Sequence, residues 1–135
     1  MITLTDTPNP ESKKFIFDFD LTVVLNKFSK EQGVDEGGLK LFEQEFKKFM
    51  LLRVSQKRKY GIMGKQDELW HIFILHTKLY TEFCDGAFGK YLHHNPAEGD
   101  DPTNPMESFA YIRFLVDYFR FYGECPPKDI WPFSF

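Results

Sequence analysis

The residues best suited to chemistry gather in one block of the sequence, between Asp67 and Pro96. The block holds all four histidines of the chain and one of its two cysteines: His71, His76, His93, His94 and Cys84. Histidine is the commonest metal ligand in proteins, and its imidazole ordinarily changes charge near neutral pH. The clustering therefore indicates a candidate site, although it does not by itself specify a reaction.

An aspartate and a histidine stand one helical turn apart at the start of this block. The pattern from Lys65 to Cys84 predicts a helix, in which residues four positions apart lie about 40° from each other. Asp67 and His71 therefore share a face. The carboxylate can ligate a metal or orient the imidazole by accepting its ring N–H. The alternative is a plain hydrogen bond that satisfies a half-buried histidine. His76 lies about 140° around the axis from His71, which does not suit one ion.

Two glycines and two more histidines follow this helix. Gly86 and Gly89 are expected to end it, after which the chain can fold back onto it. His93 or His94 would then reach His71, and the choice between them stays open. The predicted ligands are Asp67, His71, His93, His94 and Cys84, although the cysteine is better interpreted as a small buried apolar residue. The set suits a divalent metal in tetrahedral or octahedral coordination, with zinc favoured, and no organic cofactor is indicated.

Two aspartates near the N-terminus offer a different chemistry. Residues 15–23 read Phe-Ile-Phe-Asp-Phe-Asp-Leu-Thr-Val, which resembles the first motif of haloacid-dehalogenase-type phosphotransferases. The resemblance implies that Asp18 is a nucleophile, that Asp20 is an acid/base, and that both help to hold magnesium. It requires a strand, on which residues two apart point to the same side. Because the later sequence lacks the strand and helix alternation of a doubly wound sheet, this interpretation is the least favoured.

Helical signals dominate the segments that must position these side chains. Asn9-Pro10 predicts a helix start, and the helix is expected to continue to Gly33, although residues 15–23 also alternate as a strand would. A second helix is predicted from Glu36 to Gln56, with a phenylalanine-rich buried face and with Lys47 outside.

A long helix is also predicted in the final third of the chain. It should begin at Asn104-Pro105 and end at Gly123, which suits a left-handed C-terminal position. Its predicted buried face consists of Phe109, Ile112, Leu115, Val116, Phe119 and Tyr122. The tail from Ile130 to Phe135 is rich in aromatic residues, so we expect it to pack back across the bundle, over the helix that holds Trp70.

Length and composition complete the prediction of the fold. The chain has 135 residues, of which 42% are hydrophobic and 27% charged, values that are ordinary for one soluble globular domain. Together with the helical patterns they predict an all-α fold. After an N-terminal tail of residues 1–8, residues 9–135 should form a single compact bundle of about four to five helices with an ordered aromatic C-terminal tail.

Several function classes are disfavoured by the same numbers. A net charge of −3 argues against a dedicated nucleic-acid binder, and the basic run from Arg53 to Lys65 is typical of a solvated helix end. The apolar runs are too short to cross a membrane. Two cysteines without a signal-peptide pattern predict reduced thiols in the cytoplasm. A protein partner is unidentified, and the oligomeric state stays open.

Motifs spread along the chain resemble one family. In order they are Asp67-x-x-Trp70-His71, Thr77-x-x-Tyr80-x-x-Phe83-Cys84, Phe88-Gly89, His93-His94-x-Pro96, Tyr122-Gly123 and Pro126-Pro127-x-x-Ile130-Trp131-Pro132. The set resembles the glycine-rich domain-containing protein-like family over residues 36–132. The resemblance implies an all-helical domain and favours a helix for residues 10–30, but it brings no settled activity. The glycine-rich segment that names the family is absent, and Met63-Gly64 stands where Pro-Ser is expected.

The function that the sequence favours is a small soluble helical domain that binds a divalent metal through its His/Asp cluster. The alternative is a metal-free protein-interaction module, in which the histidines, Trp70 and Tyr80 knit the helices together. The magnesium-dependent phosphotransferase comes third. Whether the protein is an enzyme stays open, because an open coordination position cannot be read from sequence.

Overall fold

The computed structural model of the chain describes residues 10–94 and 105–135, with side chains from residue 109 in the second part. The described helices are α1 (Pro10–Asp18), α2 (Thr22–Gln32), α3 (Glu36–Gln56), α4 (Lys65–Leu75), α5 (Thr77–Phe88) and α7 (Pro105–Tyr122). No strand occurs in these two ranges, so the predicted all-α bundle is confirmed, with six described helices where four to five were predicted. The predicted tail of residues 1–8 and the caps Asn9 and Asn104 lie outside the described residues. None of the described helices is long and apolar enough to cross a membrane.

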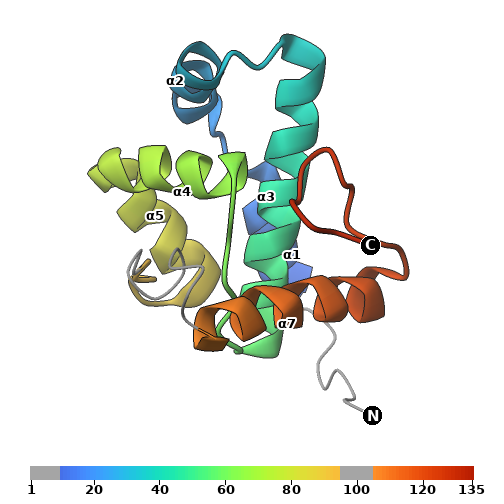
Figure 1. The fold of residues 1–135 in the computed structure, drawn as a ribbon. Helices are drawn as coiled ribbons and strands as arrows, with labels where there is room; N and C mark the ends of the chain where they lie inside the picture. Colours follow the sequence, from blue (N-terminus) through green and yellow to red (C-terminus); the bar gives the residue numbers. More distant parts are fainter. Residues whose placement is uncertain (1–9, 95–104) are drawn as a thin grey trace.

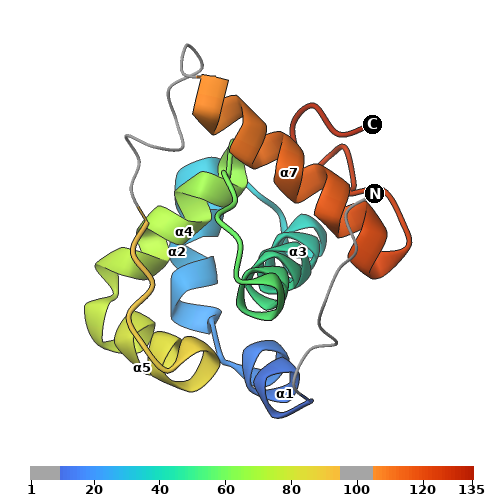
Figure 2. The ribbon, with the colours of Figure 1, turned by 90° about the horizontal axis from the view of Figure 1, so that it is seen from below.

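The long helix α3 is the centre of the bundle. Figure 2 looks nearly along it, with α1, α2, α4, α5 and α7 arranged around it, and Figure 1 shows α7 lying across it. Helices α1, α2 and α7 contact α3 directly, while α4 packs against α2 and α5. The bounds of α3 are those predicted, and the Asp35 side chain caps it by accepting from the Gly38 backbone N–H at 2.8 Å.

Aromatic rings fill the core around Phe49 of α3. This ring lies between Trp70 of α4 and Trp131 of the C-terminal segment, with centroid distances of 5.6 and 5.9 Å. Trp131 also contacts Phe114 of α7 at 4.5 Å and donates its indole N–H to Glu45 at 3.0 Å. The ordered aromatic tail is thus confirmed. It packs against α3 and α7, with Phe49 separating it from Trp70.

The first predicted helix is broken into α1 and α2. The buried ammonium of Lys47 donates to the carbonyls of Phe17 and Phe19 at 3.0 and 2.8 Å, which satisfies acceptors that a continuous helix would have used internally. Asp20 then accepts from the Thr22 backbone N–H at 2.9 Å, just where α2 begins. The prediction that Lys47 faces outward is therefore wrong, because it is only 4% exposed.

This break also removes the phosphotransferase interpretation. Asp18 ends a helix and pairs with Lys14 one turn away, and Asp20 lies in the break beyond it. Both carboxylates are exposed. Because neither follows a strand, the resemblance to the haloacid-dehalogenase motif is wrong for this chain.

The helix predicted from Lys65 to Cys84 is broken at His76, which separates α4 from α5 with φ −86° and ψ 71°. Helix α5 then continues through Gly86 as far as Phe88, and Gly89 ends it in the left-handed conformation. Gly86 was predicted to end the helix, but a Cβ there would lie 2.0 Å from the ring of Phe15. Its role is therefore to let α1 approach α5 closely.

The buried face of α7 differs from the prediction. Phe109, Ile112 and Phe119 are 60%, 50% and 49% exposed. Leu115 is buried as predicted, and Val116 and Tyr122 are half-buried. The other buried side chains from residue 109 onward are Tyr111, Phe114, Asp117 and Tyr118. Asp117 accepts from Tyr60 and Arg58, and Tyr118 donates to Glu45. Buried polar groups need hydrogen-bond partners. These bonds therefore help to decide which face of α7 turns toward the core, and that face is not the one that the apolar pattern predicted.

Candidate metal centre

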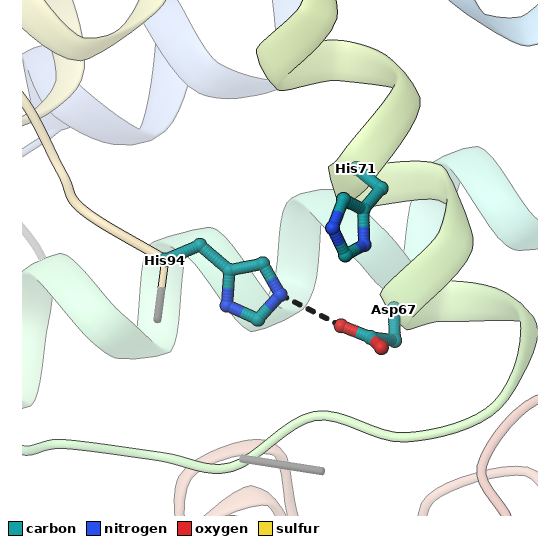
Figure 3. A group of neighbouring side chains, drawn as sticks. All are labelled: Asp67, His71 and His94. Carbon is teal, nitrogen blue, oxygen red and sulfur yellow. Dashed lines mark hydrogen bonds and ion pairs between the residues drawn. The ribbon is translucent and has the colours of Figure 1, made fainter. Parts of the chain in front are cut away.

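Helix α4 supplies two of the candidate ligands. It begins after Gly64, which has a φ of 70°. A Cβ at this position would lie 2.9 Å from the ring of Pro132, so there is no room for a side chain. Asp67 lies in the first turn, where the amide ends of the helix favour a carboxylate. It is buried, while His71, one turn later, is half-buried. The predicted pairing of these two residues on one face agrees with their positions (Figure 3).

The third ligand comes from the segment that follows α5, residues 89–94. Leu92 anchors this segment: its carbonyl accepts from the Tyr80 hydroxyl at 2.5 Å, and its N–H donates to the Cys84 sulfur at 3.5 Å. Burial then alternates, with Leu92 and His94 turned inward and His93 exposed. In extended chain, neighbouring side chains point to opposite sides. The anchoring of Leu92 therefore explains why His94, and not His93, faces α4.

The three side chains converge as Figure 3 shows. Nε2 of His94 lies 2.7 Å from Oδ1 of Asp67, and ligand-type atoms of Asp67, His71 and His94 all lie within 4.8 Å of one another. The His71 and His94 rings have centroids 5.5 Å apart at 67°. The side chains of His94 and Asp67 are 5% and 10% exposed, so this pair is shielded from water.

Trp70 lies beside the three candidate ligands, whereas the sequence predicted for it only a role in holding the helices together. Its indole stacks on the His94 ring, with centroids 4.1 Å apart and planes 8° apart, and its N–H donates to Tyr80 at 3.0 Å. Trp70 thus fixes the plane of His94, and Tyr80 links Trp70 to the Leu92 anchor. The available sequence signal was the position of Trp70 between Asp67 and His71 on the same helix.

The arrangement fits a metal with small side-chain movements. Donor atoms around tetrahedral zinc are about 3.3 Å apart for bond lengths near 2.0–2.1 Å. The Asp67–His94 contact of 2.7 Å would therefore open slightly, and His71 would move inward. Two imidazoles and one carboxylate leave a fourth position for water or another ligand. Without an ion, the hydrogen bond and the stack already hold His94 in place.

Two predicted ligands lie outside this group. His93 is exposed and packs against Tyr91, with ring centroids 4.7 Å apart. Cys84 is fully buried, and its sulfur accepts from Leu92. Burial raises the pKa of the Cys84 thiol, which disfavours the thiolate that zinc binds. Cys84 therefore helps to hold the segment that carries His94 and is not one of the converging donors.

Comparison with known proteins gives a family but no activity. A family model described as UCP032817-like matches residues 11–108, a range that includes all three converging side chains. The resemblance to the glycine-rich domain-containing protein-like family is therefore wrong, because the matching model is a different one. No curated protein and no solved structure matches the chain.

Proposed function

The chain belongs to the UCP032817-like family, and we propose that it is a small helical domain that binds a divalent metal ion, with zinc favoured. Asp67, His71 and His94 are the proposed ligands. The observation that carries the proposal is their convergence: Asp67 and His94 are 27 residues apart in the chain, yet the three donor atoms lie within 4.8 Å. An Asp/His pair alone often has a purely structural role, whereas a third donor side chain that converges on the same place favours a metal site.

The types of donor atom support zinc. Imidazole nitrogens suit zinc and other transition metals, while magnesium and calcium prefer oxygen ligands throughout. Trp70, Tyr80 and Leu92 hold His94 before any ion arrives. A ligand that is already oriented loses less freedom on binding. Three protein ligands leave one position that a water molecule or a substrate can occupy.

A metal-free interaction module is the second candidate. The observation that favours it is the exposed apolar face of α7, where Phe109, Ile112 and Phe119 are each about half exposed or more. In that case the Asp67–His94 hydrogen bond would serve only to tie the segment after α5 to α4. The two candidates differ in what His71 does, because His71 contributes to the metal group but not to the Asp67–His94 hydrogen bond.

Zinc titration of untagged, chelator-treated protein tests the proposal. We expect one zinc ion per chain, measured by calorimetry and by competition with a chromophoric chelator. His71→Ala and His94→Ala should each weaken binding by more than about tenfold. His93→Ala is the matched control, since this exposed neighbour lies outside the group and should bind as the parent does. Absence of zinc binding in the parent, or equal binding in all variants, would contradict the proposal.

A further inference from the structure

A hollow of about 580 Å³ lies between the end of α3, the turn that follows it and the end of α5. Its apolar lining comes from Val54, Phe88 and Leu92. Among the described residues, its polar lining consists of the cations Arg53, Lys57, Arg58, Lys59 and Lys90. We call it the basic hollow. Its volume falls in the range of about 300–1,000 Å³ that is usual for small-molecule sites. It uses none of the three proposed metal ligands.

Helix stabilisation explains only part of this charge. Arg53 and Lys57 belong to the C-terminal end of α3, where cations offset the helix dipole. Arg58 is paired with Asp117 at 2.8 Å. Lys90 directly follows the C-cap of α5, where a cation also offsets the helix dipole, but it reaches the hollow from a separate part of the chain. Cations from two distant segments thus surround one apolar floor.

Arg53 is the group that most needs an anion. The residue is half-buried, and the ion pairs among the described residues do not include its guanidinium. Burial accordingly lowers the pKa of Arg53. A guanidinium presents several N–H donors in a plane, which match the oxygens of a phosphate. An anion in the hollow would therefore pair with a guanidinium that has no carboxylate partner among the described residues.

We propose that the basic hollow binds a small phosphate monoester that carries an apolar group. The phosphate would lie against Arg53, Lys57 and Lys90, and the apolar group would pack on Phe88 and Leu92. A bare phosphate would use only the cations, and a neutral apolar molecule would use only the floor. Binding of the combined ligand should therefore exceed that of either part.

Phenyl phosphate is the probe, with inorganic phosphate and phenol as its two halves. Titrations followed by calorimetry and amide NMR at fixed ionic strength should give the tightest binding for phenyl phosphate, with shifts at Phe88 and Leu92. Arg53→Gln and Lys90→Gln should each weaken it by about tenfold, as expected for loss of one charged hydrogen-bond partner. Lys78→Gln is the matched control, because this exposed lysine on α5 does not line the hollow.

The variant Lys57→Gly distinguishes an effect on ligand binding from an effect on stability. Lys57 has a φ of 53°, a left-handed conformation that glycine adopts more readily. The variant should therefore melt no lower than the parent, yet bind phenyl phosphate more weakly. The proposal is overturned if the parent fails to bind phenyl phosphate at millimolar concentration. It is equally overturned if binding is the same with and without the ring, or if Lys78→Gln weakens it as much as Arg53→Gln does.

Discussion

Trp70 and His94 lie face to face, with ring centroids 4.1 Å apart and planes inclined by 8°. One residue comes from α4 and the other from the segment after α5, so the stack joins two parts of the chain that are separated in sequence by α5. It also sets the direction of the His94 Nε2 atom, which lies 2.7 Å from Asp67. The orientation of a proposed ligand thus depends on a residue that contributes no donor atom to the group.

Replacement of Trp70 should therefore weaken zinc binding without removing a ligand. Trp70→Leu removes the stacking surface and the hydrogen bond to Tyr80, and we expect zinc affinity to fall by about tenfold or more. Trp70→Phe keeps an aromatic face and should lose less. Both variants will be less stable, so the zinc competition must be run at a temperature where each is fully folded. Unchanged affinity in Trp70→Leu would contradict the positioning role.

The reactivity of the Cys84 thiol tests whether this residue belongs to the metal site. Because burial raises the pKa of its thiol, the native protein should show one fast-reacting cysteine, the exposed Cys125, in an Ellman assay near pH 8. Cys84 should react only after denaturation, and chelator treatment should not change this. If Cys84 became reactive when zinc is removed, the prediction would be contradicted and Cys84 would again be a candidate ligand.

The fold was predictable wherever the deciding contacts are local. The bounds of α3 follow from a continuous apolar period that its own residues carry. The break between α1 and α2 depends instead on Lys47, which donates to the Phe17 carbonyl 30 positions away. No local pattern contains that bond. The rotation of α7 escaped prediction for a similar reason, since the buried Asp117 accepts hydrogen bonds from Tyr60 and Arg58, which lie far from it in the sequence.

The candidate site shows the same division. Asp67 and His71 are one helical turn apart, so their proximity follows from helix geometry alone. The choice between His93 and His94 depends on the way Leu92 is held by Tyr80 and Cys84. That anchoring converts a pair of equivalent neighbours into one inward and one outward side chain. Sequence could name the pair but could not rank its members.

Stability should fall steeply above pH 10. Burial is the leading cause of a raised pKa at five tyrosines: Tyr60, Tyr80, Tyr111, Tyr118 and Tyr122. In the unfolded chain a tyrosine ionises near pH 10, so above that pH unfolding releases protons. The stabilisation is complete below pH 10 and is lost as the pH rises toward the folded-state values.

Urea unfolding at several pH values from 9 to 11 would measure this loss. Each buried tyrosine should contribute up to about 1.4 kcal/mol per pH unit once its unfolded counterpart is ionised. Tyr111→Phe should therefore make the fall shallower, although it also removes the hydrogen bond to Pro132. A parent protein whose free energy of unfolding is constant up to pH 11 would contradict the prediction.

Gly86→Ala should destabilise the protein, although alanine is the better helix former. In an open helix this change would gain up to about 1 kcal/mol. At Gly86, however, the new Cβ would lie 2.0 Å from the Phe15 ring, which packs against Phe19 and Phe83. Overpacking of this kind costs about 1–3 kcal/mol, so the net effect on the free energy of unfolding should be unfavourable. Gly37→Ala is the control, because its Cβ would meet only Asp35, at 3.8 Å.

A double-mutant cycle with Phe15→Ala identifies the cause of that loss. Phe15→Ala alone should destabilise the protein, because the ring leaves its contacts with Phe19 and Phe83. In this background the space above Gly86 is empty, so Gly86→Ala should become neutral or stabilising in urea unfolding. The same change would then have opposite signs in the two backgrounds. If Gly86→Ala costs the same with and without the ring, the close approach of α1 to α5 is not the reason for glycine at this position.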